Sequence, residues 1–345
     1  MLVAGIAWTG RGFDVAVRSA AGEPADGSVH VPAGQVGALT DHLRGLAARD
    51  ELVCVVESTN GMVDGGLMAA GLRVHRADPA MLPPRPEFGS VDADTLARTG
   101  ATRLAELPRL VLESGSLTGR DADYERFSRS SEAELAALTA AGRCVSSGPR
   151  NDADPVVALT FDDGPNPPCT GRILDVLERY GVPATFFCVG LHASAHTEEL
   201  ARMVEAGHGL GNHTWSHPFL PDLSLRECEV QLERTFDAIE GGAGVRPAPL
   251  FRPPYGSRKA ELLTWLGRIG GPTTVLWDVD TGDWAMPGAA AITEVVLAHV
   301  RPGSIVLMHD GGGDRSQTAE ALPAVIEGLL DRGYRFARVT DQLSR

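Results

Sequence analysis

The apolar residues in the first third of the chain show two kinds of pattern, one typical of helices and one typical of strands. Helical spacing of apolar residues occurs over 35–48 and 62–71. Short apolar runs of strand length occur at 2–8, 14–20, 28–33, 51–58 and 71–77. The pattern predicts an α/β layer whose first two strands form a hairpin, and it does not predict a barrel in this part of the chain.

The composition changes after this layer. From about Ser114 to Asp154 the chain is rich in Ser, Gly, Asp and Glu, with one predicted helix over 132–143 that Ser130 or Ser131 would cap. A turn-rich stretch, SSGPRNDADP, follows. We therefore expect an α/β domain over 1–115, a linker with a helix over 116–153, and a second domain over 154–345.

Strand and helix alternate regularly beyond Pro155. Predicted strands cover 156–163, 184–190, 209–215, 249–256, 273–280, 304–310 and 334–339. Predicted helices cover 172–181, 197–207, 225–241, 292–300 and 321–333. About seven βα units over ~190 residues predict a parallel barrel of the TIM type, distorted and slightly short of eight repeats.

Composition and charge narrow the function classes. A chain of 345 residues fits two domains, and 43% apolar residues allow a sizeable core. The net charge of −14, without a Lys/Arg block, argues against binding to nucleic acid or to anionic membranes. The opening residues show no signal peptide, no stretch approaches a membrane span, and the five cysteines form no CxxC pair. We expect a cytoplasmic protein.

Polar residues gather at the predicted strand ends of the second domain. The carboxyl ends of all strands of a βα barrel converge on one face, so residues ~150 apart in sequence would meet there. The residues at these ends are Asp162, Asp163, His213, His217, Arg252, Tyr255, Asp280, Asp283 and His309.

These residue types suit metal-assisted hydrolysis. Two imidazoles and a carboxylate are a usual ligand set for a catalytic divalent ion. In HTWSH, the i, i+4 spacing puts His213 and His217 on one face if the segment turns helically. Of the two neighbouring carboxylates in TFDDGP, one would bind the ion and the other would accept a proton. His309 is the remaining titratable group that could serve as the acid, with Asp283 as its candidate partner.

Five segments together resemble a known family. TFDDGP, HTWSH, FRPPYG, DVDTGDW and LMH occur in the order and approximate spacing of the motifs of polysaccharide deacetylases, the NodB homology or carbohydrate esterase family 4 enzymes. The resemblance runs from about Val156 to Val339 and includes all five motifs. It implies hydrolysis of an N-acetyl or O-acetyl group on a sugar or glycan; we expect the N-acetyl group first, and the choice between the two stays open.

The resemblance also implies roles for the residues around the ion. Asp162 would be the catalytic base, and Arg252 would orient it. Asp163, His213 and His217 would hold one divalent metal ion, commonly zinc, with cobalt or another divalent ion as alternatives.

Further roles follow for the substrate side of the site. The backbone N–H of Tyr255 would support the oxyanion, and Trp284 and Leu307 would line the pocket for the acetyl methyl group. His309 would be the acid, tuned by Asp283.

The first domain has a weaker resemblance. VVESTNG, AAGLRVHRADP and SVDADTLA are similar to elements of the ribonuclease-H-like DEDD domain of some transposases, in which Glu57 and Asp92 match and Asp94 is ambiguous. The first acidic residue of that family is replaced by apolar residues around Ala7. Because two-metal chemistry needs several carboxylates, we expect a non-catalytic scaffold or interaction domain.

Two other functions stay open at this point. One is a non-catalytic module that binds glycan or protein and keeps a structural metal, and the other is a nucleic-acid-processing protein led by the first domain. Histidines without a matched partner are expected to be surface or packing residues, namely His192, His196, His208 and His299. The sequence does not indicate which acetylated sugar is the substrate or what the oligomeric state is.

Overall fold

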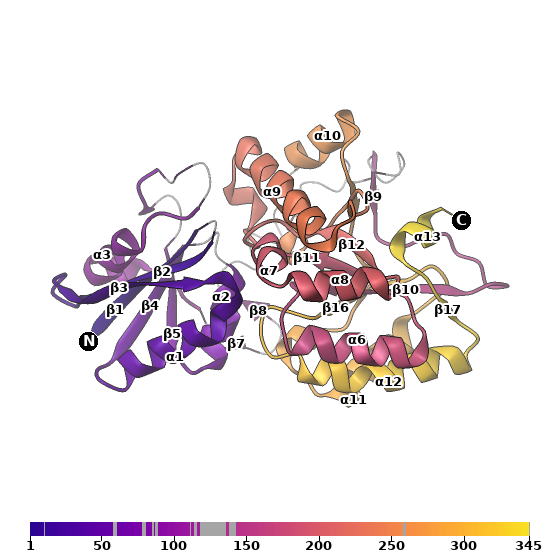
Figure 1. Cartoon of the computed structure of the whole chain (residues 1–345), viewed down its shortest axis with the longest axis horizontal. Coiled ribbons are helices and arrows are strands. Elements are labelled where there is room, and N and C mark those ends of the chain that lie inside the picture. Colours follow the sequence, from indigo (N-terminus) through magenta and orange to yellow (C-terminus); the bar gives the residue numbers. More distant parts are fainter. Residues whose placement is uncertain are drawn as a thin grey trace. The chain divides into compact units, whose positions relative to one another are not determined.

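The structure is a computed structural model. It describes residues 1–9, 11–57, 61–77, 81–84, 86, 89–110, 112–113, 116–117, 136–137, 143–257 and 260–344. The chain divides into two compact units (Figure 1). The first comprises Met1–Arg126 and Ser216–Gln231, and the second comprises Phe127–Trp215 and Leu232–Arg345. Most of the helix predicted over 132–143 lies outside the described residues.

The first unit is built on a six-stranded sheet. Its strands are β1 (Leu2–Trp8), β2 (Gly12–Ser19), β3 (Pro24–Pro32), β4 (Leu52–Glu57), β5 (Arg73–Ala77) and β6 (Arg109–Leu110). The strand order is β3-β2-β1-β4-β5-β6. β1 and β2 pair antiparallel as the predicted hairpin, whereas β4 runs parallel to both β1 and β5. The predicted α/β layer is confirmed.

Helices and a short hairpin complete this unit. They are η1 (Ala33–Gln35), α1 (Val36–Ala47), α2 (Gly61–Ala69), α3 (Ala93–Arg103), η3 (Leu104–Glu106), β7 (Leu112–Glu113) and β8 (Ser116–Leu117). α3 packs directly on β1, because a Cβ at Gly5 would lie 2.0 Å from the carbonyl oxygen of Ala93. The sequence pattern predicted α1 and α2 but not α3.

The second unit is built on a curled parallel sheet. Its strands are β9 (Cys144–Val145), β10 (Val156–Asp162), β11 (Thr185–Cys188), β12 (Gly209–Asn212), β13 (Leu250–Phe251), β14 (Thr273–Val275), β15 (Val279–Asp280), β16 (Ile305–His309) and β17 (Arg335–Phe336). The order is β15-β16-β10-β11-β12-β13-β14-β9, and β17 pairs with β10. An isolated antiparallel bridge pairs Ser147, which follows β9, with Ser304, which precedes β16. The predicted distorted barrel is confirmed.

Helices cover the outside of this sheet (Figure 1). They are α6 (Cys169–Tyr180), α7 (Gly190–Ala195), α8 (Thr197–Glu205), α9 (Leu225–Ala243), α10 (Ala260–Arg268), α11 (Ala289–His299), α12 (Ser316–Asp331) and α13 (Val339–Leu343). Two 3-10 turns accompany them, η5 (Pro254–Gly256) and η6 (Asp283–Ala285). A further turn, η4 (Leu220–Asp222), and the start of α9 lie in the segment Ser216–Gln231, which belongs to the first unit. α12 packs against both α6 and α11.

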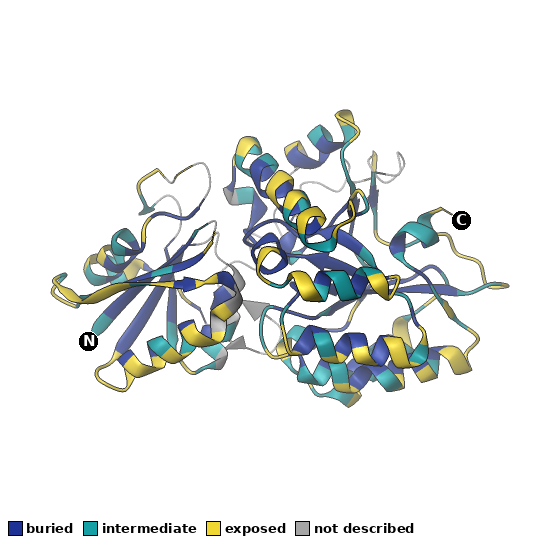
Figure 2. Cartoon of the chain, in the orientation of Figure 1, coloured by how far each residue is buried: buried dark blue, intermediate teal, exposed yellow. Residues whose placement is uncertain are grey.

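Amphipathic spacing explains how these helices form and pack. In α6 the apolar residues Ile173, Leu174 and Leu177 recur on one face and are buried in the same core as Phe161 and Phe186. Figure 2 shows buried strands and exposed outer helix faces in each unit. Among the described residues, no helix is long and apolar enough to cross a membrane.

Two predicted strands differ from those observed. The strand predicted over 249–256 ends at Phe251, because Pro253 and Pro254 have no amide hydrogen for a ladder. The strand predicted over 273–280 is divided into β14, which pairs with β9, and β15, which pairs with β16. The chain changes its partner strand between them, so one continuous strand cannot form.

Candidate active site

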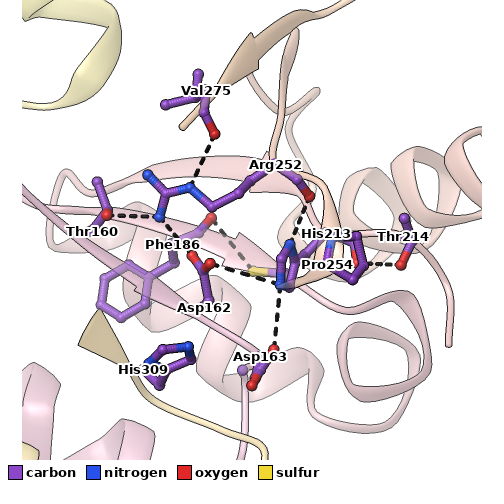
Figure 3. A network of polar contacts seen from close by, with 12 residues as sticks. Thr160, Asp162, Asp163, Phe186, His213, Thr214, Arg252, Pro254, Val275 and His309 are labelled. Atoms are coloured by element: carbon purple, nitrogen blue, oxygen red, sulfur yellow. Dashed lines mark hydrogen bonds and ion pairs between the residues drawn. The ribbon is translucent and has the colours of Figure 1, made fainter. Parts of the chain in front are cut away.

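The carboxyl ends of β10 and β16 bring the two halves of the predicted constellation together. The two strands are parallel neighbours, and Asp162 lies opposite His309 in their register. Figure 3 shows Asp162, Asp163, His213, Arg252 and His309 gathered around one space. The prediction that residues far apart in sequence meet at the strand ends is confirmed for these five.

Two of these side chains, Asp163 and His213, form a compact cluster with His217. Asp163, His213 and His217 each offer a ligand atom, and the three atoms lie within 4.8 Å of one another. The cluster is buried, and His213 Nε2 lies 3.3 Å from Asp163 Oδ1. The carbonyl oxygen of Arg252 accepts a hydrogen bond from His213 Nδ1 at 2.7 Å. This bond fixes the tautomer and leaves Nε2 facing Asp163.

The chemistry of this donor set fits a divalent ion. Two imidazole nitrogens and one carboxylate oxygen are the ligands of many catalytic zinc sites. Two ligand atoms that each lie ~2 Å from one ion are at most ~4 Å apart, and the 3.3 Å between His213 Nε2 and Asp163 Oδ1 meets this condition. The side chain of His217 is only 8% exposed, and that of His213 is 2% exposed, so this polar cluster is withdrawn from bulk solvent.

The backbone of HTWSH differs from the helical turn considered for it. β12 ends at Asn212, and the histidines follow in an irregular loop. Thr214 and His217 have positive φ angles of 68° and 56°. The left-handed residues curl the loop so that both imidazoles reach the same place. A left-handed backbone conformation costs ~1–2 kcal/mol at a residue other than glycine, so contacts with the surrounding residues must stabilise it.

Arg252 holds Asp162 from the barrel interior. Its Nη1 donates to Asp162 Oδ1 and to Thr160 Oγ1, both at 2.8 Å. Its Nε donates to the carbonyl oxygen of Val275 at 3.1 Å, and its guanidinium lies 4.1 Å from the centre of the Phe187 ring. Burial lowers the pKa of Arg252, and the charge of Asp162 opposes this shift. The second oxygen of Asp162 lies 3.7 Å from His213 Nε2.

Asp283 holds His309 in the same way. Asp283 Oδ1 pairs with His309 Nδ1 at 2.7 Å, and its Oδ2 accepts from the amide of His309 at 2.8 Å and from Thr318 Oγ1 at 2.7 Å. Burial alone would lower the pKa of His309, but the charge of Asp283 raises that pKa to about 9. Burial alone would likewise raise the pKa of Asp283, but His309 holds it below its ordinary value.

Three further predicted residues lie on the loops and strands around this space. Leu307 is buried in β16, and its carbonyl oxygen accepts from Thr281 Oγ1 at 2.8 Å. Trp284 is half-buried in η6, next to Asp283. Tyr255 is half-buried in η5 with a φ of 58°, a conformation that turns its backbone sharply.

The sequence did not reveal two buried groups that touch the TFDDGP turn. Asp310 Oδ1 accepts from the amide of Gly164 at 3.1 Å, and its Oδ2 accepts from Thr170 Oγ1 at 2.6 Å. Burial raises the pKa of Asp310 to about 7. His192, expected to be a surface or packing residue, is buried and bonded to the carbonyl oxygen of Asp163 at 2.7 Å. Its sequence neighbours gave no signal of this contact.

The other three unmatched histidines agree with the expectation for them. His208 is buried, and its Nδ1 accepts from the amide of Ala184 at 3.1 Å. His299 is exposed at the end of α11, where its ring nitrogen approaches the carbonyl oxygen of Val295. His196 is half-buried after α7.

The acidic residues of the first unit have structural partners. Glu57 is 1% exposed, and its Oε2 accepts from the amide of Val91 at 2.8 Å. Asp92 caps α3 by accepting from the amide of Thr95 at 2.8 Å. Asp94 forms a salt bridge with Arg18 at 2.7 Å. The ribonuclease-H-like resemblance of this unit remains a prediction.

Comparison with known proteins identifies the family of the second unit. Residues 150–272 match the polysaccharide deacetylase family model. The chain is similar to a chitooligosaccharide deacetylase of Sinorhizobium fredii, with 42% identity over 190 residues that cover 52% of this chain and 88% of the relative. The chain belongs to the polysaccharide deacetylase family.

Solved structures agree with this family. The Bc1960 peptidoglycan N-acetylglucosamine deacetylase is 35% identical, with a TM-score of 0.57, and the match covers 60% of this chain and 96% of that one. BA3943 of Bacillus anthracis, described as a carbohydrate esterase family 4 pseudoenzyme, is 31% identical with a TM-score of 0.53, over 59% of this chain and 69% of that one. Because the family includes a pseudoenzyme, activity has to be argued from the site itself.

Proposed function

We propose that this protein is a metal-dependent hydrolase that removes N-acetyl groups from a sugar in an oligosaccharide or glycan. The observation that carries the proposal is the pair of oriented side chains beside one metal-ligand cluster. Asp162 is held by Arg252 at 2.8 Å, and His309 is held by Asp283 at 2.7 Å. A purely structural metal site would not need either arrangement.

Asp163, His213 and His217 would hold one divalent ion, with zinc as the first candidate. When bound, such an ion supplies a Lewis acid and lowers the pKa of the water that it binds. The ion is the resident cofactor of the proposed reaction, and the remaining chemistry belongs to the side chains around it.

The proposed base is Asp162. Arg252 Nη1 engages its Oδ1, so that Oδ2, which lies 3.7 Å from His213 Nε2, is the oxygen directed toward the cluster. This oxygen would accept the proton of the attacking water. Arg252 orients the carboxylate, because its own guanidinium is fully buried and donates to four acceptors, of which Asp162 Oδ1 is one.

The proposed acid is His309. With a pKa of about 9, its imidazole carries the proton at neutral pH. Asp283 engages Nδ1, which leaves Nε2 to donate a proton to the departing amine. Attack by water on the acetyl carbonyl and cleavage of the C–N bond then yield acetate and the free amine. The backbone N–H of Tyr255 would stabilise the developing oxyanion, and Trp284 and Leu307 would receive the methyl group.

The substrate class follows from the relatives as a proposal. The Sinorhizobium protein is named for chitooligosaccharides and Bc1960 for peptidoglycan N-acetylglucosamine. Their shared chemical unit is an N-acetylated amino sugar, and we propose this unit as the substrate. The first unit would serve as a non-catalytic scaffold or interaction domain, since Glu57 and Asp92 are both engaged in structural hydrogen bonds.

A substrate panel tests this function. The zinc-loaded full chain is incubated with N-acetylglucosamine oligomers, peptidoglycan and O-acetylated xylan, and released acetate is quantified. We expect acetate from the N-acetylated substrates, and a loss of at least about 100-fold in Asp162→Asn, the range that a general base contributes. Equal acetate release by the variant, or release from the xylan alone, would contradict the proposal.

A further inference from the structure

The turn that carries Asp162, Asp163 and Gly164 is held through its carbonyl oxygens. The carbonyls of Asp162 and Gly164 accept hydrogen bonds from main-chain N–H groups at 2.9 and 3.0 Å. The carbonyl of Asp163 accepts from a side chain instead, the Nδ1 of His192 at 2.7 Å. A carbonyl oxygen only accepts, so Nδ1 carries the hydrogen whatever the charge of the ring.

Asp163 needs such support because its backbone is in a disfavoured conformation. Its φ is 76°, in the left-handed region, where residues other than glycine persist only if their surroundings hold them. The opposite side is packed by a glycine loop: a Cβ at Gly311 would lie 2.3 Å from the carbonyl oxygen of Asp163, and a Cβ at Gly312 would lie 2.4 Å from its Oδ2. Both the peptide and the carboxylate are therefore confined.

We infer that His192 is a positioning residue for the metal site, acting through the main chain of Asp163. The inference rests on the proposed function, because it assumes that Asp163 is a metal ligand. His192 is 4% exposed in α7 and is anchored by its own helix. Its hydrogen bond fixes the plane of the peptide that follows Asp163, and hence the direction in which the Asp163 side chain leaves the turn.

The expected effect of losing this bond is weaker metal binding. A residue that orients a ligand typically changes metal affinity 10- to 100-fold when it is replaced. His192 supports only one of three ligands, so we expect an increase of about tenfold in the zinc Kd. The melting temperature of the metal-free protein should change no more than in a matched control.

The test uses three variants of the full chain. His192→Leu removes the donor and keeps an apolar side chain. His192→Asn places an amide nitrogen near the position of Nδ1, whereas His192→Gln places it near Nε2. The matched control is His196→Leu, since His196 is one helical turn away and its ring lies edge-on to His192 at 6.3 Å.

Zinc affinity is measured by chelator competition, and the Co²⁺ absorption spectrum reports ligand geometry. We expect a Kd about tenfold higher for His192→Leu, a value within about threefold of wild type for His192→Asn, and an intermediate or weak value for His192→Gln. Unchanged binding by a folded His192→Leu would overturn the inference. If that variant does not fold, equal affinities of the Asn and Gln variants would overturn it instead.

The failure of this inference is separable from that of the proposed function. If the wild-type chain binds neither zinc nor cobalt, the proposed metal site is wrong and the inference falls with it. If the wild type binds the metal and all variants bind it equally, only the role of His192 is wrong.

Discussion

Replacement of Asp283 by Asn removes the charge beside His309 and one of the two acceptor oxygens that hold it. Asp283 Oδ1 pairs with His309 Nδ1 at 2.7 Å and Oδ2 accepts from the His309 backbone N–H at 2.8 Å, so the single amide oxygen of Asn can replace only one of the two. The lost quantity is the negative charge that raises the pKa of His309 to about 9. Without it, burial is opposed mainly by the smaller effect of the Asp163 charge, so the pKa of His309 should fall.

The size of the effect follows from the protonated fraction. At pH 8, a group with a pKa of about 9 is ~90% protonated, whereas a group with a pKa of 6.5 is ~3% protonated. If the pKa of His309 returns to the ordinary value of 6.5 and His309 donates the proton to the leaving group, kcat/KM at pH 8 should fall about 30-fold. Activity that requires the protonated imidazole of His309 should decrease as the pH rises through the pKa of this group.

The assay is a pH–rate profile of acetate release between pH 6 and 10. Wild type should lose activity with an alkaline limb near pH 9, and this limb should move to lower pH in Asp283→Asn. Asp280→Asn is the matched control, because Asp280 is an exposed carboxylate of the same motif that bonds only locally to Gly282 N. An identical alkaline limb in wild type and Asp283→Asn would refute this reasoning.

Three other perturbations give separate tests. Arg252→Met leaves the buried carboxylate of Asp162 without its partner at 2.8 Å. The unfolding free energy measured in urea should fall by about 3–5 kcal/mol, and activity should be lost. An unchanged unfolding midpoint would count against the buried pair. Gly312→Ala places a Cβ 2.4 Å from Asp163 Oδ2 at a φ of +72°, so calorimetry should show weaker zinc binding and a stability loss of about 1–2 kcal/mol. Gly313→Ala, whose Cβ would lie 3.5 Å from the nearest atom of Arg315, should bind zinc more tightly than Gly312→Ala. Stability from the His309–Asp283 pair should be full below pH 6.5 and decline as the pH rises through about 9, which thermal melts of wild type and Asp283→Asn across that range would reveal.

The sequence was sufficient to predict the parts of the site that depend on topology. Parallel strands end at one face, so Asp162 and His309 could be expected to meet, and they lie opposite each other in neighbouring strands. The alternation of strands and helices likewise predicted the curled parallel sheet. These inferences need only the hydrophobic pattern and the handedness of βα units.

The parts that could not be predicted depend on backbone conformations and on main-chain partners. Nothing in HTWSH signals positive φ angles at Thr214 and His217, because these residue types ordinarily avoid that region. His192 escaped notice because its partner is a carbonyl oxygen 29 residues away, which carries no side-chain signature. The break between β14 and β15 was missed because it depends on which strands lie alongside.

The most direct measurement is a zinc titration of the metal-free full chain, with acetate release from an N-acetylglucosamine oligomer followed at each addition. Asp163, His213 and His217 form one site, so acetate release should rise linearly and reach its plateau at one zinc ion per chain. Acetate release that is undetectable at every zinc concentration, or that is already maximal in the metal-free chain, would contradict a deacetylase built around that cluster.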